Sequence, residues 1–133
     1  MDMKWMRILG YAGLVPFAAA ALGHLAGLPV DRLGLAYGAI ILSFLGGIQW
    51  GSTLHAADFQ RERLVASIVP SLVAWAALLM AQPFASTMLI GGLAGQWLFD
   101  RRMAERAGWS DAFMTLRTHL SLGAGLSLGV LLV

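Results

Sequence analysis

AYGAIILSFLGGIQWG, residues 36–51, is the stretch that decides the fold class of this chain. It is apolar enough to lie in lipid, yet it contains Gln49 and Trp50 close to the pair Gly46 and Gly47. Lipid alone requires neither a polar amide nor residues without side chains. Small and polar residues in an apolar helix are typical of contacts between membrane helices. The stretch therefore predicts a membrane helix that packs against other helices.

The composition of the whole chain points to lipid as its solvent. Of 133 residues, 59% are hydrophobic and 12% are charged, whereas soluble domains carry about 25% charged residues. A soluble domain of this length could not hide so much apolar surface in one core. The net charge of +2 does not suggest a nucleic-acid partner, and the absence of cysteine excludes a thiolate metal site or a cysteine nucleophile.

Apolar segments make up most of the chain. A membrane-spanning helix needs about 20 residues, with a range of about 17–25, and spanning β-strands would alternate apolar and polar residues. These segments do not alternate, so we expect an all-α, single-domain integral membrane bundle over residues 1–133. Its five transmembrane helices are expected at residues 8–28, 33–57, 64–82, 84–100 and 111–133.

Prolines and caps should shape these helices. Pro16 removes a backbone donor inside the first span, so it should kink that helix. Pro70 also removes a donor and frees the carbonyl of Ala66, which Ser71 or a neighbouring helix could satisfy. The loop between the fourth and fifth helices is expected at residues 101–110, with a break at Gly108, and Ser110 is expected to cap the start of the fifth helix. The N-terminal segment also resembles a signal peptide, but its apolar run continues to Leu28, which favours an uncleaved span.

The distribution of Lys and Arg predicts the orientation. Eight lie on one side of the expected spans and one, Arg32, on the other. By the positive-inside rule, the N-terminus is cytoplasmic and the C-terminus outside, in a bacterial inner membrane. Trp5, Trp97 and Trp109 should lie at the inner boundary. The eight inner residues are Lys4, Arg7, Arg61, Arg63, Arg101, Arg102, Arg106 and Arg117.

Pairs of glycines four residues apart mark possible close contacts between helices. Such spacing favours tight packing within one bundle, and the alternative is an interface between copies of the chain. The pairs are Gly23/Gly27, Gly34/Gly38, Gly47/Gly51, Gly91/Gly95 and Gly125/Gly129. Trp50 and Trp75 are expected to lie deeper in the membrane than the inner boundary. At that depth, a tryptophan side chain more often fills a gap between helices than stacks on a cofactor.

A set of polar side chains falls at similar depth in the inner half of the expected bilayer. Polar groups at such depth are costly and are candidates for function. The candidate polar pocket consists of Gln49, Ser71, Gln96, Arg117 and His119. Alternatively, Gln49 is structural glue between helices and Arg117 extends to the lipid headgroups.

Asp100 and Arg117 form a candidate ion pair across the fourth and fifth spans. Gln96, one helical turn before Asp100, could share the donors of the arginine. The alternative is that Asp100 pairs locally with Arg101 or Arg102. No catalytic residue, cofactor or metal site is predicted, because the three histidines lie at unmatched depths and no catalytic motif is present.

Three blocks carry a family resemblance: residues 36–51, PSLVAW at 70–75, and the pair Asp100-Arg101. They resemble an uncharacterised family of small multi-span inner-membrane proteins of bacteria, related to mitochondrial transmembrane protein 69 of animals. The resemblance implies a compact membrane bundle and supplies no activity. The family-like residues are Gly46, Gly47, Gln49, Trp50, Pro70, Trp75, Asp100 and Arg101.

These patterns favour a non-catalytic binding, scaffold or assembly protein that meets the lipid bilayer and a membrane protein complex or its own copies. The alternative is a small transporter or a lipid- or quinone-binding protein with a polar pocket in the inner half of the bilayer. An intramembrane enzyme is the weakest interpretation. A cavity that reaches Gln49, Arg117 or His119 would favour the alternative over the scaffold.

Overall fold

The computed structural model describes residues 3–55 and 60–133, and every regular element in these residues is a helix. The predicted all-α fold is thus confirmed. The end of the second expected span, residues 56 and 57, lies outside the described part of the chain. The helices are α1 (Met3–Ala12), α2 (Val15–Leu25), α3 (Asp31–Leu54), α4 (Arg61–Ala66), α5 (Val69–Leu78), α6 (Phe84–Ala107) and α7 (Asp111–Val130).

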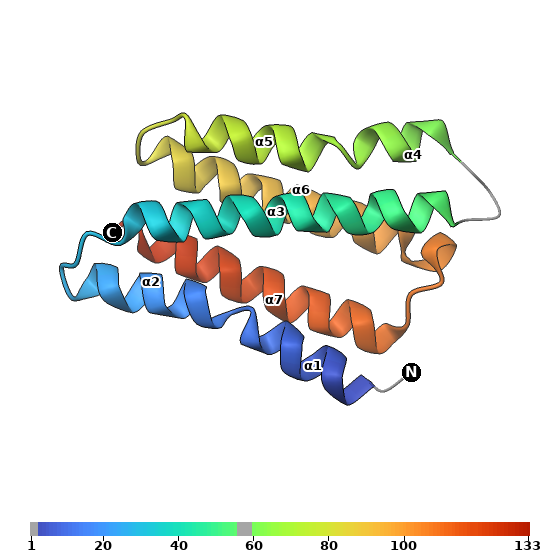
Figure 1. Cartoon of the computed structure of the whole chain (residues 1–133), viewed down its shortest axis with the longest axis horizontal. Coiled ribbons are helices and arrows are strands. Elements are labelled where there is room, and N and C mark those ends of the chain that lie inside the picture. The colour runs from blue at the N-terminus through green and yellow to red at the C-terminus, as the bar shows by residue number, and fades with distance from the viewer. Residues whose placement is uncertain (1–2, 56–59) are drawn as a thin grey trace.

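These helices form five roughly antiparallel rods that correspond to the five apolar segments (Figure 1). Two rods are broken, one between α1 and α2 and the other between α4 and α5. Helix α3 lies at the centre and contacts α2, α4, α5, α6 and α7. Helix α1 lies at the edge of the bundle, where it packs mainly on α7.

Both breaks fall immediately before a proline. Pro16 and Pro70 each occupy the first turn of a helix, α2 and α5 respectively. A proline there lacks only a backbone donor that the helix does not use, so the helix restarts at that point. The kink predicted at Pro16 is thus present as a break, and a second break occurs at Pro70. The predicted cap is also present, since Ser110 Oγ accepts a bond of 3.1 Å from the Phe113 backbone N–H. The expected end of the fourth helix at residue 100 is wrong, because α6 continues to Ala107 and ends at Gly108 with φ of 70°.

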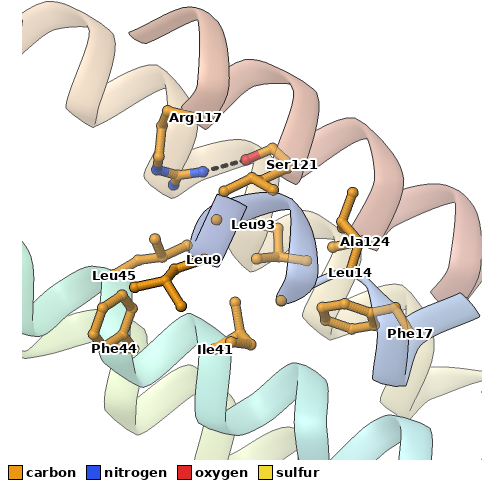
Figure 2. A pocket seen from close by; sticks show the side chains of 13 residues that line it. Leu9, Leu14, Phe17, Ile41, Phe44, Leu45, Leu93, Arg117, Ser121 and Ala124 are labelled. Carbon is orange, nitrogen blue, oxygen red and sulfur yellow. Dashed lines mark hydrogen bonds between the residues drawn. The ribbon is translucent and has the colours of Figure 1, made fainter. Parts of the chain in front are cut away.

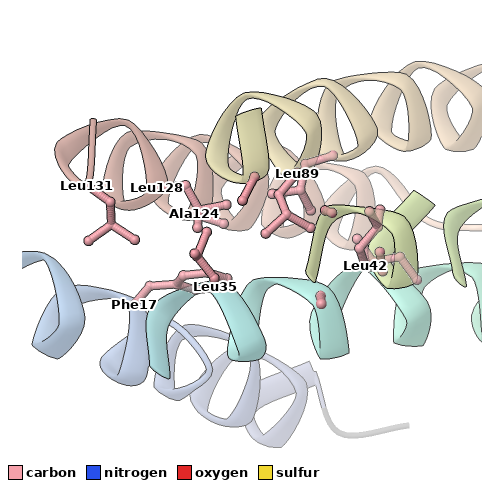
Figure 3. Close-up of a cluster of buried hydrophobic side chains, with 13 residues drawn as sticks. Phe17, Leu35, Leu42, Leu89, Ala124, Leu128 and Leu131 are labelled. Carbon is pink, nitrogen blue, oxygen red and sulfur yellow. The ribbon is translucent and has the colours of Figure 1, made fainter. Parts of the chain in front are cut away.

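The centre of the bundle is apolar, and so is much of its outside. Phe17, Leu35, Leu42, Leu89 and Leu128 are buried between α2, α3, α6 and α7 (Figure 3). Many large apolar side chains face outward instead, including those of α3, α5 and α7. An exposed apolar surface of this extent is typical of a protein in contact with lipid or partners.

Among the described residues, two segments are long and apolar enough to cross a membrane by length and composition, namely Met3–Leu25 and Asp31–Leu54. That these two segments and the other three rods cross a membrane stays a prediction, as does the orientation of the termini.

Glycines make close contacts at some of the predicted pairs only. A Cβ at Gly34 would lie 2.9 Å from Ala20, and one at Gly46 only 2.5 Å from the Ser67 carbonyl oxygen, so α3 is tightly packed at both positions. Seven glycines of the predicted pairs have nothing within 4 Å of that position, so for them the prediction of tight contacts within the bundle is wrong. They are Gly27, Gly47, Gly51, Gly91, Gly95, Gly125 and Gly129.

The two deep tryptophans also face outward. Trp50 is 41% exposed and Trp75 65% exposed, so the prediction that they fill gaps between helices is wrong. Trp50 directly follows the fully buried Gln49, and Trp75 directly follows the buried Ala74. One step along a helix turns the side chain by about 100°, which carries each indole away from the packed face.

Candidate functional site: a buried polar network and the cavity beside it

Gln49 lies at the centre of a polar network near the C-terminal end of α3. Its side chain is fully buried, and Nε2 donates a bond of 2.7 Å to Asp100 Oδ1 on α6. Gly46 lies one helical turn earlier on the same helix, where it lets the backbone at Ser67 approach α3. The missing side chain at Gly46 therefore brings the α4–α5 rod close to the amide of Gln49.

Asp100 is the common acceptor of the network. Besides Gln49, it accepts a bond of 2.8 Å from Gln96 Nε2, one turn earlier on α6. Its second oxygen, Oδ2, accepts a bond of 2.9 Å from Arg117 Nε on α7. The predicted partners Asp100 and Arg117 thus meet, and Gln96 joins them. A buried carboxylate with three donors is held in one position.

Arg63 completes the network from α4. Its Nε and Nη2 donate bonds of 3.0 and 2.9 Å to Gln49 Oε1, and Nη2 also reaches Ser52 Oγ at 3.1 Å. Sequence reasoning treated this buried arginine as an inner-boundary charge and missed its role. Its spacing could have revealed it, because Ser67 and Pro70 follow at four and seven residues and lie on the same packed face.

Arg117 leaves one donor unused. Its Nη1 donates to Ser121 Oγ one turn later on α7. Its Nη2 is buried and has no hydrogen-bond partner, and it is the one such side-chain nitrogen or oxygen in the described residues. A buried donor without an acceptor is costly, because its bonds to water are lost and not replaced.

An apolar cavity of about 160 Å³ adjoins Arg117. Arg117 and Ser121 lie on one side of it, and Phe17, Ile41 and Phe44 lie on the other (Figure 2). Side chains from α1, α2, α3, α6 and α7 enclose it, and the other lining side chains are apolar. The remaining lining residues are Leu9, Gly10, Gly13, Leu14, Leu45, Leu93, Leu120 and Ala124.

Two residues of the predicted pocket do not join this site. Ser71 and His119 are exposed, so the prediction is wrong for both. His119 follows Arg117 by two residues, which turns it by about 200° to the other side of α7. There its Nδ1 is 2.8 Å from the Tyr11 hydroxyl on α1. Ser71 lies one step beyond the buried Pro70 and faces outward for the same geometric reason.

The family-like residues divide between the network and the outer surface. Gly46, Gln49, Pro70 and Asp100 are buried where α3, α5 and α6 meet. The others, Gly47, Trp50, Trp75 and Arg101, are exposed. The guanidinium of Arg101 lies over the Trp97 ring, 5.4 Å from its centroid, instead of pairing with Asp100.

The histidine on the other side of the expected membrane makes separate contacts. His24 Nδ1 is 2.7 Å from Asp31 Oδ1, and its Nε2 is 3.1 Å from the Val133 carbonyl oxygen. Within residues 3–55 and 60–133, no three His, Asp or Glu side chains gather as metal ligands would.

Residues 3–133 match a protein family described as protein of unknown function (DUF3429). The chain belongs to this family. It is 36% identical over 129 residues to transmembrane protein 69 of Xenopus tropicalis, a match covering 90% of this chain and 50% of that protein. It is 38% identical over 78 residues to transmembrane protein 69 of Mus musculus, covering 53% of this chain and 32% of that one. No solved structure matches the chain.

These comparisons confirm the family resemblance that the sequence motifs predicted. The chain spans half or less of the length of these relatives. The names of the relatives and the apolar composition of this DUF3429 chain agree on a transmembrane protein.

Proposed function

We propose that this DUF3429 protein is a five-span inner-membrane protein that binds a lipid-like molecule in the cavity beside Arg117. One observation carries the proposal: the only buried side-chain donor without an acceptor in the described residues belongs to an arginine that lines an apolar cavity. Ligand sites combine apolar walls with a few polar groups that fix the orientation of the ligand. The cavity beside Arg117 has this character.

The five-span arrangement supports the same proposal. The network lies where α3 and α6 end and α4 and α7 begin, which is the end of the bundle that carries most of the Lys and Arg residues. With the N-terminus inside, this end faces the cytoplasm. A ligand with its polar end at Arg117 would then lie within the inner half of the bilayer.

The polar network supports a binding role more than a catalytic one. Asp100 accepts three hydrogen bonds, and the amide of Gln49 is used on both sides, by Arg63 and by Asp100. Groups so fully engaged hold the helices and the guanidinium of Arg117 in place. A general base needs an accessible lone pair near the proton that it removes.

Native mass spectrometry of the purified protein in a mild detergent tests the binding function. We expect a bound molecule of small mass to remain on the protein. Ile41→Trp should fill the cavity and remove the bound mass, because Ile41 forms part of its wall. Ile40→Trp is the matched control, since Ile40 is exposed on the same helix and does not line the cavity. An unliganded wild-type protein, or equal retention by both variants, would contradict the proposal.

A scaffold or assembly role is the second candidate, and the outward glycines favour it. The pairs Gly47/Gly51, Gly91/Gly95 and Gly125/Gly129 leave open faces on α3, α6 and α7, which could admit a helix of a partner or of another copy. Co-purification from membranes tests this role. A partner that Gly91→Leu and Gly125→Leu both release would support it, whereas a partner that both variants retain would exclude these faces.

A further inference from the structure

We infer that the molecule bound beside Arg117 is a single-chain lipid that ends in a carboxylate, with one carboxylate oxygen accepting from Arg117 Nη2. This inference rests on the proposed binding function and specifies its ligand. It follows from three properties of the cavity: the donors at its polar side, the charge of the network and the volume available.

The donors at the polar side of the cavity belong to Arg117 and Ser121. Arg117 uses Nε for Asp100 and Nη1 for Ser121, and its third nitrogen is buried with no acceptor. Nη2 itself is buried and does not open onto the cavity, so an acceptor in the cavity that Arg117 lines would meet this nitrogen after a small movement of the guanidinium. Ser121 Oγ accepts from Nη1, so its own hydroxyl proton is a second donor on the same side. Two donors side by side suit the two oxygens of a carboxylate.

The charge of the network favours an anion over a neutral acceptor. It contains two guanidinium groups, those of Arg63 and Arg117, and one carboxylate, that of Asp100. The excess is one positive charge among buried side chains, which is unfavourable in a medium of low dielectric constant. Asp100 already has three donors, so it does not also serve Nη2. A carboxylate in the cavity would satisfy that donor and bring the total charge to zero.

The volume selects a single chain. A cavity of about 160 Å³ is comparable to one of about 150 Å³ that accommodates benzene in another protein. It is too small for two acyl chains or a phospholipid headgroup. Leu9 on α1 and Phe44 on α3 line the cavity and are also exposed on the outside of the bundle. The remainder of an alkyl chain could therefore leave the cavity between α1 and α3 and continue into the bilayer.

Palmitate labelled with ¹³C at its carboxyl carbon tests the inference, with the protein in phosphatidylcholine nanodiscs. We expect a protein-bound carboxyl resonance that is distinct from the bilayer signal. It should disappear in Ile41→Trp and Arg117→Gln and persist in Ile40→Trp. Ser121→Ala keeps the Arg117–Asp100 pair, so this variant should fold even if Arg117→Gln does not. Its apparent affinity for palmitate should fall about tenfold or more, as expected for a lost bond to a charged group.

Competition separates this inference from the proposed function. Unlabelled palmitate should displace the bound resonance, whereas methyl palmitate, which has the same chain without the charge, should not. Equal displacement by both would overturn the carboxylate assignment. A protein that lacks the palmitate resonance but retains another small molecule in native mass spectrometry would overturn the inference and leave the binding function intact. Absence of any bound molecule would reject both.

Discussion

Replacing Asp100 by asparagine should be among the most damaging single changes in this protein. The substitution removes the charge that Arg117 faces and presents an amide N–H₂ to donors that have lost an acceptor. In the structure, the amides of Gln49 and Gln96 both donate to Oδ1, which asparagine retains as an oxygen, whereas Arg117 Nε donates to Oδ2, the position that becomes N–H₂. The lost bond between charged groups is worth about 1.5–3 kcal/mol. Because the buried guanidinium is also left without its partner, we expect a loss near the roughly 3–5 kcal/mol typical of breaking a buried ion pair.

The same geometry predicts an asymmetry between the two partners. Arg117→Gln loses the bond to Asp100 but also removes the unpartnered Nη2, so it should cost less than Asp100→Asn. Equilibrium unfolding in mixed detergent micelles measures both variants, their combination and the control Arg101→Gln, whose side chain is exposed. The double variant should lose less stability than the sum of the two single losses. Additive losses, or a larger loss for Arg117→Gln, would refute this reasoning.

Four further changes test other parts of the structure. Gly46→Leu should lower the free energy of unfolding in detergent by at least the roughly 1–3 kcal/mol of ordinary overpacking, because its Cβ would meet a backbone oxygen. Gly47→Leu should change the free energy of unfolding little in the same assay, because nothing lies within 4 Å of its Cβ position. Arg63→Gln should lower the melting temperature as measured by intrinsic fluorescence, since Gln49 Oε1 loses its donors. Tyr11→Phe should speed amide hydrogen exchange in α1 and leave α3 unchanged; equal exchange in both proteins would contradict a tether there. A periplasmic reporter fused after Val133 should be active, and a silent one would reject the five-span topology.

The rods and their interruptions could be predicted because they depend on local chemistry. Apolar length sets where a helix can lie in lipid, and proline or a serine cap sets where it begins. The contact between Asp100 and Arg117 could also be predicted from the sequence. A short connection, expected at residues 101–110 and found at 108–110, makes α6 and α7 neighbours, and Asp100 and Arg117 both lie near it.

Rotation about each helix axis was harder to predict, and it explains the errors. In a lipid-embedded bundle both the inside and the outside are apolar, so the spacing of apolar residues does not distinguish the packed face. Helix α3, for example, has large apolar side chains on its buried and its exposed sides alike. Depth alone thus assigned Ser71 and His119 to the pocket, although both face outward. Arg63 was assigned to a boundary because its charge was counted without regard to the face that it shares with Ser67.

The network and the cavity belong to parts of the bundle that are held with different strength. Hydrogen bonds among Gln49, Arg63, Asp100 and Arg117 connect α3, α4, α6 and α7. Helix α1, which supplies part of the cavity wall, has no buried residue of its own and joins α7 through the Tyr11 contact. Elements with few buried contacts open at low free-energy cost. A molecule that enters the cavity from the bilayer would therefore displace α1 and meet a guanidinium that the rest of the bundle already holds in position.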